Sequence, residues 1–114
     1  MGTACGNCSN GILKDCFQSQ CIPVDGYERG VMSINRMIPG PEIHICKYDV
    51  LVVNVKNKMP GTETTIHWHG ISQEHNQWMD GVPYVTQCPI GANTFTYILE
   101  ARETGTYFYH SHAG

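Results

Sequence analysis

Apolar and polar positions alternate in short segments along the chain, and turn-forming residues separate those segments. Residues 50–57 (VLVVNVKN) are rich in β-branched residues and alternate towards their end, which is typical of a half-buried strand. The same reasoning predicts short strands at 31–35, 42–46, 64–69, 95–101 and 106–110. Because no segment has convincing helical periodicity, the pattern predicts an all-β fold, an antiparallel sandwich or barrel.

Six cysteines in 114 residues change this picture at the amino-terminal end. Residues 1–26 hold four of them and few large apolar side chains, so we expect a Cys-rich loop segment followed by a β domain over 27–114. Such cysteine use indicates disulfides in an oxidising compartment, or a metal cluster. The spacing Cys5-x2-Cys8 with Cys16-x4-Cys21 also leaves a structural zinc site open.

The first residues carry no basic and apolar leader, although the cysteines favour a secreted protein. We therefore expect this sequence to be part of a longer chain whose signal peptide is not included. The end of the sequence leads to the same expectation, because the chain stops at Gly114, just after the second His pair, and leaves the edge of the last predicted strand uncovered.

Charge and hydropathy exclude two classes of partner. Charged residues make up 15% of the chain, against about 25% in a typical soluble protein, and the net charge is −3 without a basic cluster. Nucleic acid is therefore not an expected partner, since phosphate binding needs concentrated positive charge. The longest apolar runs are also too short to span a bilayer.

Four of the six histidines form two His-x-His pairs, His67 with His69 and His110 with His112. In an extended strand, residues i and i+2 face the same side, so each pair directs two imidazoles in one direction. Imidazole binds copper, zinc, iron and nickel, and the absence of acidic residues inside the pairs argues against calcium and magnesium. The four side chains could hold one zinc ion or half of a multinuclear copper site.

The residues around these pairs resemble a known family. The segments HWHG (67–70), DGVP (80–83), QCPI (87–90) and GTYFYHSHAG (105–114) occur in the order and spacing of the first cupredoxin domain of multicopper oxidases, laccases most closely. Asn35 and the segment PGP (39–41) are similar to the first strand of that domain, and the Cys-rich start is similar to arthropod laccases.

The resemblance implies a cupredoxin-like Greek-key sandwich that is incomplete at its carboxyl end, and a copper role for each paired histidine. His67 would bind the type 2 copper, whereas His69, His110 and His112 would bind type 3 coppers. Asp80 would act as a proton donor near this trinuclear cluster. The family's type 1 copper site, with a His-Cys-His motif that this sequence lacks, and the remaining trinuclear ligands lie in a last cupredoxin domain. This segment alone should therefore be inactive.

The implied activity is that of a secreted laccase, which oxidises phenolic or similar reductants and reduces O2 to water. Ferroxidase and ascorbate oxidase activities remain open within the family. From a different class, a secreted copper or zinc carrier without catalytic activity is an alternative, as is a disulfide-stapled interaction domain with incidental histidines. The resemblance also favours disulfides over zinc for the cysteines, with their connectivity open.

The other histidines and large aromatic residues are expected to serve the fold. His44, on the polar side of a predicted strand, and His75, in a polar loop, are expected at the surface. Trp68 should point away from its neighbouring histidines into the core.

Overall fold

A computed structural model describes residues 21–22, 24–25, 27, 29–71 and 77–112. The chain divides into two compact units, residues 1–43 and residues 44–114, and each is described by itself. Cys5, Cys8, Cys16 and His75 lie outside the described residues. The expectations for these four side chains therefore stay predictions.

The first unit contains a tight turn where a strand over 31–35 was predicted. Ile34 and Met37 form an isolated antiparallel bridge, with N–O distances of 3.4 and 3.0 Å, around Asn35 and Arg36, whose φ angles are 52° and 61°. Two successive positive φ values are typical of the turns that reverse a chain within two residues. The predicted strand is therefore wrong. Residues 42–46, which span the division between the units, form no strand either.

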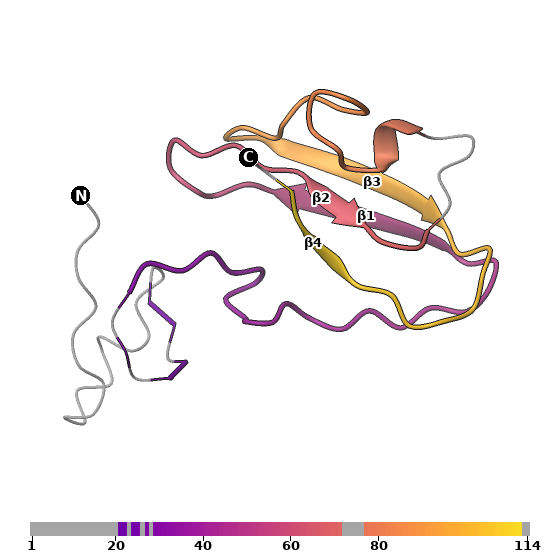
Figure 1. Cartoon of the computed structure of the whole chain (residues 1–114), viewed down its shortest axis with the longest axis horizontal. Helices are drawn as coiled ribbons and strands as arrows, with labels where there is room; N and C mark the ends of the chain where they lie inside the picture. The colour runs from indigo at the N-terminus through magenta and orange to yellow at the C-terminus, as the bar shows by residue number, and fades with distance from the viewer. Residues whose placement is uncertain (1–20, 23, 26, 28, 72–76, 113–114) are drawn as a thin grey trace. The chain divides into compact units, whose positions relative to one another are not determined.

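The second unit is built on two antiparallel strands, β1 (Val50–Lys56) and β3 (Thr94–Glu100), which run side by side in Figure 1. Their register pairs Leu51 with Leu99 and Val53 with Tyr97. Exposed and half-buried residues alternate along β1, as the period of two predicted. The odd-numbered side chains face the core, where Tyr97 and Leu99 are fully buried.

Two shorter strands, β2 (Ile66–Trp68) and β4 (Tyr109–Ser111), form a second antiparallel pair. Backbone hydrogen bonds extend this pairing at both ends, from His69 N to Phe108 O (3.0 Å) and from His112 N to Thr65 O (2.9 Å). Both strands fall on segments predicted as strands, although β4 lies at the end of its predicted range. The described residues are thus mostly β, as expected.

The core of this unit joins the two strand pairs. Trp68 is 5% exposed and packs edge-on against Tyr97, with ring centroids 5.6 Å apart. The Tyr97 hydroxyl accepts a hydrogen bond from the Ile66 backbone N–H at 2.9 Å. This bond links β3 to β2, so Trp68 lies in the core as predicted.

A short 3-10 helix, η2 (Gln77–Met79), is the helical element of the described second unit. Nowhere in the described residues does a helix reach the length and apolar character needed to cross a membrane. The thiols of Cys46 and Cys88 are free and exposed.

The hydrogen bond between Tyr97 and Ile66 predicts the effect of Tyr97→Phe. This substitution leaves the Ile66 amide buried without its partner, so we expect it to lower the free energy of unfolding by about 1–3 kcal/mol. Denaturant unfolding measures the change. Tyr84→Phe is the matched control, because Tyr84 is 83% exposed and its change should stay within about 0.5 kcal/mol. Equal effects of the two substitutions would contradict this role of Tyr97.

Candidate metal centre

The pairing of β2 with β4 brings the four paired histidines together. His67 lies directly opposite His110 in the register, and His69 and His112 follow two residues further along each strand. The ring centroid of His67 is 4.5 Å from that of His69, 5.6 Å from that of His110 and 5.9 Å from that of His112. Two segments that lie about 40 residues apart in the sequence therefore supply one cluster of imidazoles, named here the histidine cluster. The spacing predicted a common direction within each pair, and the family resemblance implied that the two pairs share a site.

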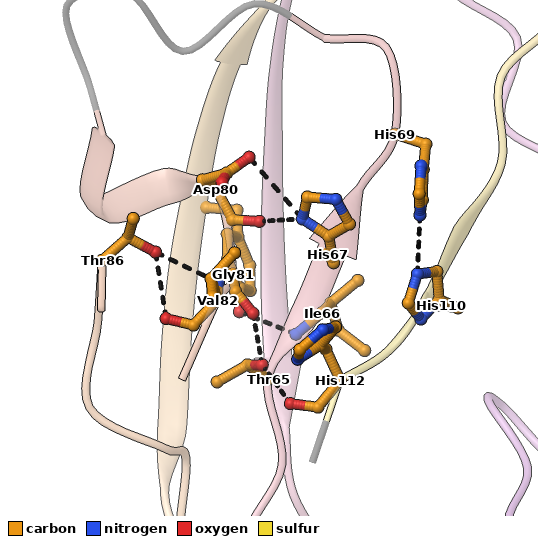
Figure 2. Close-up of polar contacts among 11 residues, drawn as sticks. Thr65, Ile66, His67, His69, Asp80, Gly81, Val82, Thr86, His110 and His112 are labelled. Carbon is orange, nitrogen blue, oxygen red and sulfur yellow. Dashed lines mark hydrogen bonds and ion pairs between the residues drawn. The ribbon is translucent and has the colours of Figure 1, made fainter. Parts of the chain in front are cut away.

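Two of these imidazoles face each other nitrogen to nitrogen. His69 Nε2 lies 2.8 Å from His110 Nε2 (Figure 2). An N–H···N hydrogen bond needs one protonated and one unprotonated nitrogen, so this pair shares one proton. A metal ion could replace that proton, because both nitrogens already point into the same space.

Backbone carbonyl groups orient two of the rings. His67 Nδ1 lies 2.5 Å from Asp80 O, and His110 Nδ1 lies 2.8 Å from Ser111 O. Since a carbonyl oxygen can only accept, each Nδ1 carries the hydrogen and donates it. Each Nε2 is then left with the lone pair that binds metals, the arrangement common around metal-bound histidines.

Asp80 lies beside His67, as the sequence suggested for a residue near the site. Its Oδ1 is 3.6 Å from His67 Nδ1, and its side chain is 32% exposed. The next residue, Gly81, is buried with φ of 78°, and a Cβ there would overlap the Ile66 carbonyl group. The absence of a side chain at Gly81 therefore lets the Asp80 loop approach β2 closely.

His69 lies against an aromatic ring and beside two other imidazoles. Its ring stacks on Phe108, with centroids 4.3 Å apart and an interplanar angle of 26°. Desolvation lowers the pKa of His69, and the neighbouring imidazoles of His67 and His110 lower it further. The lowered pKa favours the neutral ring, which is the form that binds a metal.

The chemistry of the histidine cluster fits copper or zinc rather than calcium or magnesium, because its members are imidazoles and not carboxylates. Within the part of the chain that the structure describes, no three His, Cys, Asp or Glu side chains are grouped so as to hold one ion. The cluster therefore fits a set of ligands shared with other parts of a site better than a finished single-ion site. His44 is exposed, as expected.

Sequence reasoning missed two residues that shape this site. Thr65 is fully buried, and its hydroxyl lies between the backbone carbonyl oxygens of Gly81 and His112. Phe108 stacks on His69, a contact that its position two residues before His110 on an extended segment could have indicated. Nothing in the sequence pattern marks Thr65, because its two partners lie 16 and 47 residues away.

A match to a known protein family places this chain among its relatives. The family model described as multicopper oxidase matches residues 16–114. This chain belongs to the multicopper oxidase family. The match includes the whole histidine cluster, and the fold of the second unit is accordingly cupredoxin-like.

Curated multicopper oxidase relatives match this chain over a small part of their own length. Oxidoreductase OpS5 of Beauveria bassiana is 52% identical over 77% of this chain and 15% of its own length. Laccase-2 of Botryotinia fuckeliana is 45% identical over 83% of this chain and 16% of its own. L-ascorbate oxidase of Brassica rapa subsp. pekinensis is 45% identical over 79% of this chain and 16% of its own length. These relatives are fungal and plant proteins, so they do not support the arthropod-like character suggested by the Cys-rich start.

Solved multicopper oxidase structures agree with this assignment. The laccase from Botrytis aclada is 45% identical, with a TM-score of 0.73 over 80% of this chain and 17% of that chain. Fet3p, described as a multicopper oxidase that functions in iron import, is 40% identical, with a TM-score of 0.70 over 75% of this chain and 16% of that chain. These matches support the cupredoxin-like fold predicted from the sequence.

The close approach of Gly81 to β2 predicts that Gly81→Ala damages both the fold and the site. The new Cβ would overlap the Ile66 carbonyl group and push the Asp80 loop away from His67. We expect a loss of stability about 1–3 kcal/mol larger than that of a matched control, and a lower copper content of the full-length protein. Denaturant unfolding and metal analysis measure the two effects.

The matched control is Gly61→Ala. Gly61 also has a positive φ, 67°, but a Cβ there meets nothing within 4 Å. It therefore carries the backbone strain of the substitution without the overlap. If the two variants lose the same stability and the same copper, the close approach has no role in the site.

Proposed function

We propose that this chain supplies the copper-binding first cupredoxin domain of a laccase-type oxidase, which oxidises phenolic or similar reductants and reduces O2 to water. The observation that carries the proposal is the convergence of four imidazoles, from two His-x-His pairs, at the β2–β4 register. Several relatives of this chain are named laccases, which supports a laccase activity among the activities of the family.

The proposed ligand assignment follows the resemblance to the family. His67 binds the type 2 copper, and His69, His110 and His112 bind the type 3 coppers. The Nδ1 contacts of His67 and His110 with backbone carbonyl groups, which leave each Nε2 unprotonated, and the approach of His69 Nε2 to His110 Nε2 support these roles. The resemblance also implies that the other ligands and the type 1 copper come from a last domain. The chain spans 15–17% of the length of OpS5 and of the two Botryotinia laccases that it matches.

Copper, when bound, supplies the electron transfer that reduces O2, and this chain's residues supply orientation and a proton. The Asp80 Oδ1 atom lies 3.6 Å from His67 Nδ1, and its side chain is part exposed, so it lies between solvent and the histidine cluster. The role of proton donor that we propose for Asp80 follows the resemblance to the family, and this position supports it. Phe108 shields one face of His69 from water.

A ferroxidase and an ascorbate oxidase are the alternatives within the family. The likeness to Fet3p and to L-ascorbate oxidase keeps both open, because the identities are close to those of the laccases. A copper or zinc carrier is the alternative outside it, and the rest of the encoded chain distinguishes the classes: a His-Cys-His motif in a later domain favours the oxidase.

We further propose that the protein is secreted and that its Cys-rich segment is held by disulfides, with residues 1–26 as that segment and 27–114 as the cupredoxin-like domain. Cys21 is buried and disulfide-bonded, which supports the disulfides. The cysteine content is typical of oxidising compartments.

The copper assignment predicts a specific loss in the full-length protein. His69→Ala or His110→Ala removes one of two imidazoles that face each other, so we expect loss of the near-ultraviolet absorption of the type 3 coppers and of O2 consumption with a phenolic substrate. Absorption spectroscopy and an oxygen electrode measure these changes.

His44→Ala is the control for this experiment, because His44 is exposed and outside the histidine cluster. It should keep both the near-ultraviolet band and O2 consumption. The proposal fails if His69→Ala and His110→Ala keep them as well. Normal copper loading with oxidation of ferrous iron or ascorbate, but not of phenols, would favour the corresponding alternative.

A further inference from the structure

Thr65 is buried next to the histidine cluster, where it contacts the backbone of Gly81 and of His112. Its side chain is fully buried, and Oγ1 lies 2.5 Å from Gly81 O and 2.7 Å from His112 O (Figure 2). The two carbonyl oxygens belong to the loop that follows Asp80 and to the end of the second His-x-His pair. One hydroxyl therefore contacts both the Asp80–Gly81 loop and the segment that ends the second His-x-His pair.

The chemistry of these groups gives the hydroxyl a defined role. Both carbonyl oxygens can only accept, and the hydroxyl has one hydrogen, so Thr65 donates to one carbonyl at a time or shares its hydrogen between them. Its χ1 angle is restricted because Thr is β-branched, which keeps the hydroxyl aimed at this point. Loss of the donor to a carbonyl group that water does not reach costs free energy of folding. This cost favours a structure in which Gly81 O and His112 O both stay close to the hydroxyl.

The backbone of Thr65 adds a second hold on the same histidine. The His112 N–H donates to Thr65 O at 2.9 Å, while His112 O lies near the Thr65 hydroxyl. On the other side, the loop held at Gly81 presents Asp80 O to His67 Nδ1. Through its hydroxyl and its backbone carbonyl, Thr65 thus connects the ring orientation of His67 with the position of His112.

We propose that Thr65 is a positioning residue of the copper site, which holds His67 and His112 in the geometry that binds the metal. This inference rests on the proposed function, since it takes the histidine cluster to be a copper site. Thr65 touches no reacting atom in this proposal. Its effect passes through the Asp80–Gly81 loop and through the backbone of His112.

The neighbouring Thr64 offers a matched control. It is also buried, at 6% exposed, and it precedes β2 as Thr65 does. Its hydroxyl donates only to the backbone of the next residue, Thr65 O, at 3.2 Å. Thr64→Val therefore makes the same chemical change one residue away. It removes a donor to Thr65 O, which keeps its hydrogen bond from the His112 N–H at 2.9 Å, and it leaves the contacts of the Thr65 hydroxyl with Gly81 O and His112 O in place.

The test compares Thr65→Val, Thr65→Ser and Thr64→Val in the full-length, copper-loaded protein. Thr65→Val keeps the shape and removes the hydroxyl. We expect it to release copper to a chelator about tenfold faster and to lose the near-ultraviolet band of the type 3 coppers relative to the blue absorption of the type 1 copper. Thr65→Ser, which restores the hydroxyl, and Thr64→Val should match the unsubstituted protein in both measurements.

Each other outcome counts against this inference. A Thr65→Val protein with unchanged copper release and spectrum overturns it, as does a Thr65→Ser protein that behaves like Thr65→Val or a Thr64→Val protein with the same loss. A Thr65→Val protein that does not fold also overturns it, because the hydroxyl then serves the fold and not the site. If the unsubstituted protein holds copper and only this inference fails, the proposed function stands; if the unsubstituted protein takes up no copper, both fail.

Discussion

Three residues of β2 pair with three residues of β4, and this short register is what the rest of the site depends on. Because side chains on a strand repeat every two residues, placing His67 opposite His110 also places His69 and His112 on the same side. A slip of one residue on either strand would turn two imidazoles into the core and expose Trp68 or Tyr109. The same pairing therefore sets both the core and the histidine cluster.

So short a strand pair needs support from its surroundings, and the structure supplies it on both sides. Tyr97 binds the backbone of Ile66 from within the core, while Gly81 allows a loop to lie against the same residue. Thr65 contacts that loop and His112 together. Each support is a buried contact to backbone, so the imidazoles are oriented by the fold before any metal binds, which is what a preorganised site requires.

The sequence predicted those parts that depend on local pattern. Alternation identified the strands that became β1 and β3, and the His-x-His spacing identified the common direction of the two imidazoles in each pair, because both follow from a period of two. The meeting of the two pairs depends on the pairing of β2 with β4, which only the resemblance to the family implied. The prediction of strands from alternation failed at 31–35 and 42–46. Alternation indicates only which way side chains point, whereas a strand also needs a hydrogen-bonded neighbour. At Asn35 and Arg36 the positive φ values reverse the chain instead. Thr65 escaped notice because its role depends on partners 16 and 47 residues away, which only the folded chain brings near.

We propose that the four imidazoles of this multicopper oxidase chain form one side of a shared copper site. A crystal structure of the full-length protein, with anomalous diffraction at the copper absorption edge, tests this directly. We expect copper peaks within bonding distance of ring nitrogens of His67, His69, His110 and His112, with the remaining ligands from another domain. Copper peaks elsewhere in the protein, with none beside these four rings, would contradict it.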